Sequence, residues 1–415
     1  MTTFLRRWIS ISFLNLVFVA CLGVTLRYKI AFYLPFVQQK FVLHGHSHFA
    51  FAGWISQTLM VLLIYNLSLK KGAQVFKKYQ WLLYANCITA YGMLVSFIFQ
   101  GYGLFSITFS TLSIFVSYFF CVYYWKDLSA KNERIISNWW IKAALLFNVI
   151  SSVGAFGLAF MMANKIVHQN WYLAAIYFYL HFQYNGWFLF AGMGLLVAKL
   201  EQGNVSLKKM RTAFLLFAVA CVPAYFLSAL WLPIPRIIYI IVVGAAIAQL
   251  VGWWIMVKEF IRVRTFIICN FLKYGRVLLL LAAVAFSIKL LLQAGSVHPA
   301  LSQLSYGFRP IVIGYLHLVL LAVTSLFLIG YIVVFQLIPV TKNLKSGIFI
   351  FVAGIIINEL LLMLQGVTGL AYISIPWIDL YLLIAALILL SGAVVMLMAG
   401  LKIKSVETGG FIEPG

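Results

Sequence analysis

The chain has 415 residues, of which 64% are hydrophobic and only 9% are charged, and its mean hydropathy is +1.04. This composition excludes a water-soluble globular domain and is typical of an integral membrane protein. The formal net charge of +22 would favour nucleic acid as the partner of a soluble protein. In a membrane protein such basic residues determine topology, so we expect no nucleic-acid partner.

Twelve apolar segments follow one another along the chain. Each is long enough to cross a hydrocarbon core of about 30 Å, which takes about 20 helical residues. In chain order they cover residues 10–34, 42–66, 80–100, 103–125, 138–162, 171–198, 211–231, 236–257, 275–293, 310–337, 346–368 and 376–400. We therefore expect an all-α bundle of about twelve transmembrane helices, with one transmembrane domain over 1–404 and a short flexible tail over 405–415.

Basic residues are distributed unevenly between the two sets of loops. With the N-terminus inside, the inner segments hold 23 of the 30 lysines and arginines, including Lys131 and Arg134. The outer segments hold the remaining seven: Arg27, Lys29, Lys40, Lys165, Arg236, Lys289 and Arg309. This asymmetry predicts an even number of spans with both termini inside, most simply in a bacterial inner (plasma) membrane.

The five cysteines are scattered singly, and neither a CxxC nor a CxxCH motif occurs. We therefore expect no disulfide framework, no cysteine-based zinc site and no covalently attached haem. There is also no nucleophile elbow, phosphate loop or HExxH motif, so the sequence gives no support for hydrolase or nucleotide chemistry.

Three of the seven histidines, His44, His46 and His48, stand together near the start of the second span. A histidine inside a membrane is costly unless it has a partner, so the triplet indicates a metal, a haem or a proton path. Because residues four apart share a helix face, His44 and His48 should point one way and His46 roughly the other. One helix does not readily aim all three at one iron, so at least one should bond a neighbour, line water or contact a propionate.

Two more histidines lie inside spans, His181 in the sixth and His317 in the tenth. With the N-terminus inside, every even-numbered span enters from the outer face. At 1.5 Å per residue, His46 lies about 8 Å deep, His317 about 10 Å and His181 about 15 Å. The intramembrane histidines thus gather in the outer half of the bilayer. His168 and His298 fall in outer loops, where we expect them to be solvated.

Glu359 lies in the middle of the eleventh span, beside Asn358. A carboxylate at this depth is a candidate for a functional role. Two interpretations stay open: Glu359 relays protons, or Asn358 simply helps to hold it protonated.

The histidine pattern resembles subunit I, the catalytic subunit, of the haem–copper oxidase superfamily, which includes cytochrome oxidases and nitric oxide reductases. The segment from His46 to Trp54 is similar to the second span of C-type oxidases, where a haem-binding histidine precedes a Gly-aromatic pair. The segment from His181 to Trp187 is similar to the sixth span of nitric oxide reductases, whose histidine binds a non-haem metal. Tyr315-Leu316-His317 stands where the family has a His-x-His pair.

This resemblance implies the subunit I fold and a low-spin b-type haem with His46 and His317 as its axial ligands. It also implies that His44 or His48 orients a ligand or contacts a propionate, and that Arg309 or Arg236 replaces the propionate-binding arginines of the family.

The chain departs from the family at the centre that reduces oxygen or nitric oxide. Position 315 is tyrosine instead of histidine, and the seventh span has no histidine where active members carry a pair for copper. The oxidases have a tyrosine crosslinked to the span-six histidine, and Tyr184 stands only three residues from His181. We expect no copper, although His181 stays a candidate metal ligand. Tyrosine can ligate haem iron, so Tyr315 and His181 leave room for a second haem.

These features predict a membrane haemoprotein that serves electron transfer, or gas or redox sensing. We expect it to lack a complete centre for reducing oxygen or nitric oxide. Whether it has an oxidoreductase activity stays open. Its expected partners are a cytochrome or a quinol, and membrane lipid. Two alternatives remain. One is a twelve-span transporter whose histidines and Glu359 form a substrate or proton path. The other is a structural or assembly subunit that binds no cofactor.

Overall fold

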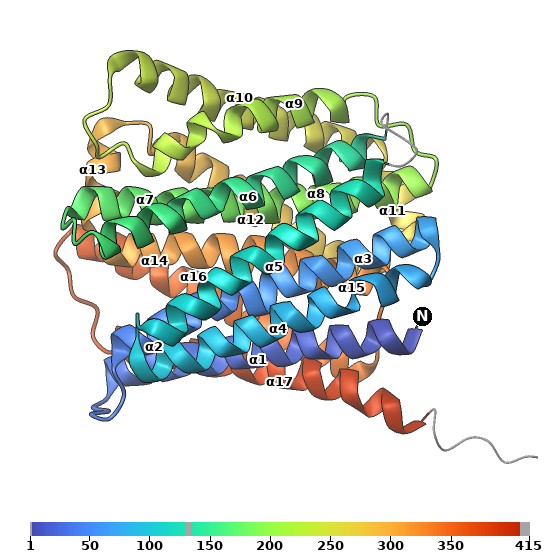
Figure 1. Ribbon diagram of the computed structural model, residues 1–415, viewed down its shortest axis with the longest axis horizontal. Helices are drawn as coiled ribbons and strands as arrows, with labels where there is room; N and C mark the ends of the chain where they lie inside the picture. Colours follow the sequence, from blue (N-terminus) through green and yellow to red (C-terminus); the bar gives the residue numbers. More distant parts are fainter. Residues whose placement is uncertain (1, 130–134, 407–415) are drawn as a thin grey trace, which may run out of the picture. The chain divides into compact units, whose positions relative to one another are not determined.

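The computed structural model describes residues 2–129 and 135–406, and within these ranges every regular element is a helix (Figure 1). The predicted all-helical bundle is therefore confirmed. Residues 407–415 of the predicted tail lie outside the described residues, as do the inner-loop residues Lys131 and Arg134.

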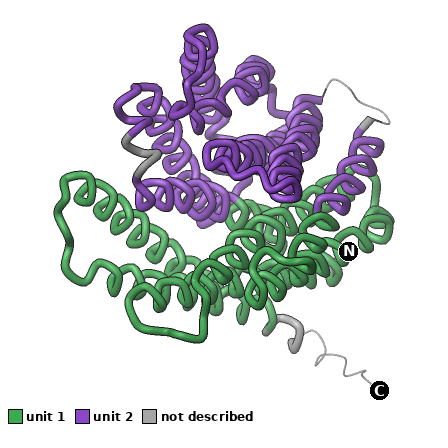
Figure 2. The backbone as a smooth tube through the Cα atoms, turned by 60° about the vertical axis from the view of Figure 1, so that its left-hand side comes forward, with its two compact units in different colours: residues 1–113, 328–415 green, residues 114–327 purple. Residues whose placement is uncertain are grey.

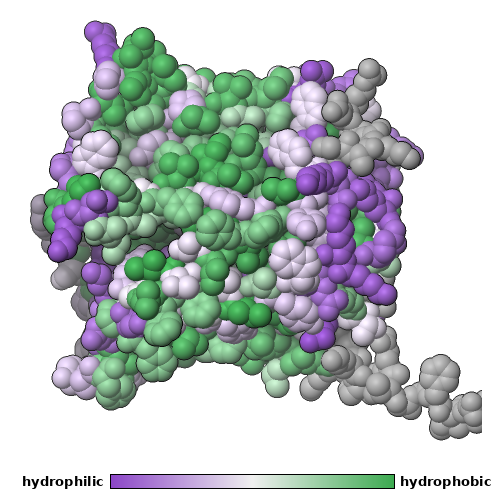
Figure 3. All heavy atoms as spheres, viewed as in Figure 1, coloured by the Kyte–Doolittle hydropathy of each residue, from purple (hydrophilic) through white to green (hydrophobic). Residues whose placement is uncertain are grey.

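Ten helices in the described part of the chain are long and apolar enough to cross a membrane, and they coincide with ten of the twelve predicted spans. The other two predictions fall on the helical stretch 169–202 and on a shorter apolar helix, Met210–Cys221. Large apolar side chains face outwards on the spans: Phe99, Leu104 and Phe349 are each at least 75% exposed. Figure 3 shows hydrophobic residues over much of the visible face. Together these features are those of an integral membrane protein.

The contacts within the chain divide it into two compact units, coloured separately in Figure 2. Unit 1 contains residues 1–113 and 328–415, and unit 2 contains residues 114–327. The chain passes between the units inside α5 and again inside α15. The single transmembrane domain over 1–404 stays a prediction.

Unit 1 is built around α1, which packs along α17 and α2, while α4 packs against α2 and α3 and α16 packs along α17. Its elements are α1 (Thr2–Ala31), α2 (Gln39–Phe49), η1 (Ala50–Ser56), α3 (Gln57–Lys71), α4 (Gln74–Gln100), the start of α5 (Leu104–Ser129), most of α15 (Leu326–Val334), α16 (Lys342–Leu370) and α17 (Ile378–Val406).

Unit 2 packs α6 against α7 and α8, α9 against α10, and α12 against η4. Besides the rest of α5, its elements are α6 (Ile136–Ala163), α7 (Gln169–His181), η2 (Phe182–Phe188), α8 (Leu189–Gln202), α9 (Met210–Cys221), η3 (Pro223–Ser228), α10 (Arg236–Arg262), α11 (Arg264–Asn270), α12 (Lys273–Gly295), α13 (Pro299–Gly307), α14 (Arg309–His317) and η4 (Leu318–Ser325).

Local side chains set several helix ends. The hydroxyl of Thr341 accepts a hydrogen bond from the Leu344 N–H at the start of α16. His168 is exposed, as predicted, and its Nδ1 accepts a hydrogen bond from the Trp171 N–H and so caps α7. At the end of α4, Gly101 has a φ of +61°, a conformation that favours glycine.

Three helical stretches contain a π-helical segment shortly after a histidine. In the described chain, η1 begins four residues after His46, while η2 and η4 begin directly after His181 and His317. Short π-helical segments are rare and often lie at functional sites. Their recurrence beside the three histidines marks these helices as candidates for a functional site.

A π-helical turn is wider than an α-helical turn, so some backbone carbonyls in these segments lack a helical partner. Side chains from neighbouring helices donate hydrogen bonds to them. In η1, Asn15 Nδ2 donates to the Gly53 carbonyl at 2.5 Å, and Asn86 Nδ2 donates to the Ala52 carbonyl at 3.1 Å. Asn15 comes from α1 and Asn86 from α4, so helices on both sides hold η1 in its π-helical form.

Candidate functional site

His46 lies on the face of α2 that meets α1. Its Nδ1 donates a hydrogen bond to the Val19 carbonyl at 3.1 Å, because a carbonyl oxygen can only accept. The neutral imidazole therefore carries its lone pair on Nε2, as in most metal-binding histidines. The ring is half-buried, and a Cβ added at Gly23 would lie 3.6 Å from its Cε1 atom.

Arg27 lies four residues after Gly23 on α1 and is half-buried. Its guanidinium is close enough to His46 to act on the imidazole electrostatically, and Asp379 at the start of α17 acts on Arg27 in the same way. A guanidinium in this position can bind a carboxylate through two parallel hydrogen bonds. Sequence reasoning missed this role because it counted Arg27 only as an outer basic residue.

His317 uses the same ring nitrogen as His46, although its hydrogen bond stays within its own helix. It is the last residue of α14, and its Nδ1 donates a hydrogen bond to the Ile313 carbonyl at 2.8 Å. The lone pair therefore again lies on Nε2, and the ring is half-buried. His46 belongs to unit 1 and His317 to unit 2, so each unit presents one half-site of the same form.

His44 and His48 lie on another face of α2, turned toward the end of α4, as their spacing predicts. His48 Nε2 is hydrogen-bonded to the Tyr102 hydroxyl at 3.2 Å, and its ring stacks on Phe97 with 4.4 Å between centroids. The ring of His44 lies edge-on to Tyr102 at 4.6 Å. Both histidines therefore contact residues different from those around His46.

His181 is fully buried, and both of its ring nitrogens make hydrogen bonds. Nε2 donates to the Cys221 carbonyl at 2.8 Å, and Nδ1 accepts from Asn185 Nδ2 at 3.0 Å. In this arrangement each nitrogen of His181 already has a protein partner.

The bond to Cys221 has a local cause. Pro223 begins the 3-10 helix η3, and the Tyr225 N–H bonds to the Val222 carbonyl instead of continuing the α-helical pattern to Cys221. The carbonyl of Cys221 thus loses its helical partner at the end of α9, and His181 replaces that partner.

Asn185 connects His181 to a buried lysine. Lys289 Nζ donates to Asn185 Oδ1 at 2.6 Å and lies 5.5 Å from the centroid of the Phe286 ring. Lys289 is only 2% exposed, and within the described residues no carboxylate forms an ion pair with it. We had placed Lys289 among the outer basic residues, but it lies inside α12. A buried charge of this kind marks a functional candidate.

Two tyrosines complete the polar interior of unit 2. The rings of Tyr184 and Tyr315 pack edge to face, with 6.3 Å between their centroids. Tyr184 also lies 6.4 Å from the His181 ring. The structure therefore brings together three residues that the sequence singled out, His181, Tyr184 and Tyr315. Sequence reasoning missed the partners of this network, Asn185 and Lys289 above all.

Glu359 and Arg309 lie apart from these groups. The carboxylate of Glu359, on α16 in unit 1, accepts a hydrogen bond from Asn358 Nδ2 at 3.2 Å, and its neighbour Leu360 is 60% exposed. Arg309 is the exposed first residue of α14. Neither is part of the His181 network as the structure describes it.

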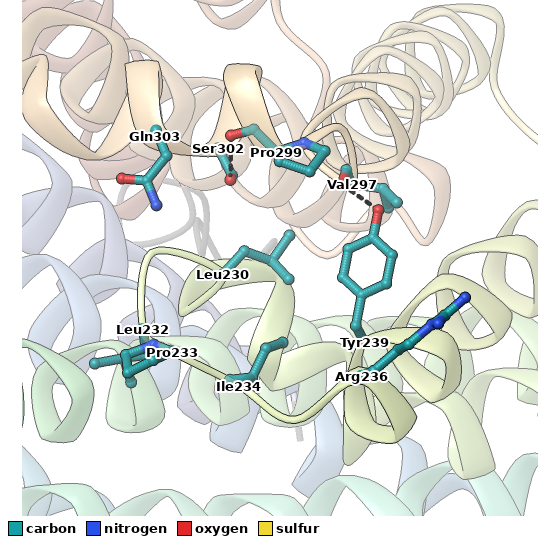
Figure 4. A pocket seen from close by; sticks show the side chains of 10 residues that line it. All are labelled: Leu230, Leu232, Pro233, Ile234, Arg236, Tyr239, Val297, Pro299, Ser302 and Gln303. Carbon is teal, nitrogen blue, oxygen red and sulfur yellow. Dashed lines mark hydrogen bonds between the residues drawn. The ribbon is translucent and has the colours of Figure 1, made fainter.

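Unit 2 also has a pocket of about 400 Å³ beside the start of α10 and the start of α13 (Figure 4). The hydroxyls of Tyr239 and Ser302 in its lining donate to the backbone carbonyls of Val297 and Pro299. No histidine lines this pocket, and none of the residues of the His181 network does so.

Within residues 2–129 and 135–406, no group of three or more His, Cys, Asp or Glu side chains is placed to hold a metal ion. No protein-family model matches the chain, and no curated protein matches it. Fold and site together define an all-helical membrane protein with histidine-bearing spans interrupted by π-helical segments.

Proposed function

We propose that this chain is a membrane haemoprotein that resembles subunit I of the haem–copper oxidases and carries one b-type haem, with His46 and His317 as axial ligands. The observation that carries the proposal is the form shared by the two half-sites. At each, Nδ1 donates to a backbone carbonyl, the lone pair lies on Nε2, the ring is half-buried and a π-helical segment follows. The pairing of the two histidines on one iron follows from the resemblance of their motifs.

A haem with two imidazole ligands supplies one-electron transfer and has no open iron position for a substrate. The carbonyls of Val19 and Ile313 fix the proton at Nδ1 of each imidazole and orient the ring. Arg27 offers its guanidinium to a propionate. Electron transfer, or sensing of gas or redox state through the same haem, is therefore the activity that we propose.

The contacts in unit 2 support the further proposal that no complete reducing centre accompanies this haem. Both nitrogens of His181 have protein partners, and the Tyr315 ring packs against Tyr184. Asn185 bonds both His181 and Lys289, so the ammonium of Lys289 lies near His181 and would repel a metal cation there. We accordingly propose neither copper nor a second haem there.

We further propose twelve spans with both termini inside, in a bacterial inner membrane, and a cytochrome or quinol as redox partner. In this arrangement the stretch 169–202 is the sixth span, and α9 with η3 is the seventh. The uneven distribution of basic residues between the loops supports the orientation.

A visible spectrum of the detergent-purified protein, produced with a sufficient haem supply, tests the proposal. We expect a sharp Soret band and split α and β bands after dithionite reduction, with about one haem per chain by pyridine haemochrome. Absence of a Soret band would refute the haem proposal and favour the transporter hypothesis, in which the histidines and Glu359 line a path.

Replacing Arg27 with glutamine should lower the reduction potential of the haem while leaving the haem content unchanged. A nearby positive charge stabilises the reduced iron, which carries one charge less than the oxidised form. A potentiometric titration followed at the α band measures the shift. Arg309→Gln is the matched control and should leave the potential unchanged. The opposite result would give the propionate role to Arg309.

A further inference from the structure

His44, His48 and Tyr102 form a group of donor atoms in unit 1 that the proposed haem does not use. The two histidines are four residues apart on α2, a spacing that lets a helix hold one metal ion between two imidazoles. His48 Nε2 lies 3.2 Å from the Tyr102 hydroxyl, and the Tyr102 ring also contacts His44. Two imidazoles and one phenol therefore meet at the end of α4.

The imidazole of His44 gives the strongest indication that this group binds a ligand. Its Nε2 atom is buried and has no hydrogen-bond partner in the described part of the chain. A buried polar nitrogen without a partner is costly, and native structures usually explain it by water, an ion or a ligand. A metal ion bound to this nitrogen would remove the cost.

The surroundings hold the donors in place before any ion binds. Tyr102 lies in a tight turn between α4 and α5, where the Ser106 hydroxyl donates to the Gly101 carbonyl at 2.7 Å and accepts from the Gly103 N–H at 2.8 Å. A Cβ at Gly101 would come within 2.4 Å of the Phe41 ring, so only glycine fits this turn. Phe97 supports the ring of His48 by stacking. Such supporting contacts are what a preorganised site requires.

The chemistry of the donors selects the ion. Imidazole and phenol oxygen favour zinc and copper, whereas magnesium and calcium need several carboxylates or carbonyls. The ammonium of Lys40 acts on His44 electrostatically and opposes any cation there, so the ion must be one that imidazole binds strongly.

We propose that His44, His48 and the Tyr102 hydroxyl bind one divalent transition-metal ion, Zn²⁺ or Cu²⁺, with water as a further ligand. This site uses neither His46 nor His317, so it stands or falls independently of the proposed haem.

Zinc binding to the full-length protein, purified with a tag that contains no histidine, tests the site. After treatment with EDTA, equilibrium dialysis against ZnCl₂ with elemental analysis should show about one zinc per chain. His44→Phe and His48→Phe keep the aromatic packing and should weaken binding about tenfold or more. Ser47→Ala, on the same helix, and His298→Ala, an exposed histidine, are matched controls and should bind zinc like the wild type.

Unchanged zinc affinity in His44→Phe, or no zinc bound by the wild type, would overturn the proposal. Size-exclusion chromatography and circular dichroism of both histidine variants should match the wild type, which shows that they fold. A visible spectrum of the copper-loaded protein tests Tyr102 as the third ligand. The Tyr102→Phe variant should lose the phenolate-to-copper absorption of the wild type. Identical copper spectra in the two proteins would exclude Tyr102 as a ligand.

Discussion

Replacing His317 with alanine should abolish the low-spin haem spectrum of the purified protein. The iron would lose one of its two imidazole ligands, so the split α and β bands should disappear and the ratio of haem to protein should fall. His46→Ala should have the same effect, because each half-site supplies one ligand. Spectra before and after dithionite reduction, together with haem quantification, measure both changes.

Three variants serve as controls for this result. His168→Ala and His298→Ala alter histidines outside the spans and should keep the full spectrum. His317→Gly leaves space where the ring stood, so added imidazole should restore the low-spin bands and show that the protein is folded. Retention of the full haem complement by His317→Ala would refute the proposed ligand pair.

Asn185→Leu should destabilise the protein strongly, by about 3 kcal/mol or more, because it removes the acceptor of a buried ammonium. Asn185 Oδ1 accepts from Lys289 Nζ, and its amide nitrogen donates to His181. In the variant, Lys289 Nζ has lost its acceptor and His181 Nδ1 has lost its donor, and both atoms stay buried. Thermal unfolding of the purified protein in detergent measures the loss.

The double variant Asn185→Leu/Lys289→Met separates the charge from simple packing. Because methionine has no charge to desolvate, the double variant should recover most of the stability that the single variant loses. Lys289→Met alone should cost less than Asn185→Leu, because it leaves only the Asn185 carbonyl oxygen without its donor and leaves no amine unpaired. If the double variant were no more stable than Asn185→Leu, the cost would lie in the packing around residue 185 and not in the buried ammonium.

Most of the fold could be predicted from hydropathy alone. Ten of the predicted segments are long, largely apolar helices, which length and composition identify without knowledge of packing. The two remaining predictions fall where the pattern is weaker. The stretch 169–202 carries His181, Gln183 and Asn185, and Pro223 ends the α-helix of the 211–231 segment early.

The site could be predicted only in part. Helical spacing correctly separated His46 from His44 and His48, because that separation is a local property of one helix. The contacts that complete the groups join distant segments: 104 residues separate Asn185 from Lys289, and 54 separate His48 from Tyr102. Nothing in a single sequence pairs such residues. Lys289 did carry a signal, as a lone lysine in the apolar run Ser287-Ile288-Lys289-Leu290.

The three π-helical segments determine where the histidines point. In an α-helix each residue turns the chain by about 100°, so one additional residue within a turn rotates everything beyond it by that angle. The part of each span that carries the histidine therefore does not share a single apolar stripe with the part that follows. Deleting one residue from η1 would turn His46 away from Val19, although no residue that contacts His46 would have been substituted. Chain length within these short segments, as much as any ligand residue, thus sets the direction of the imidazoles.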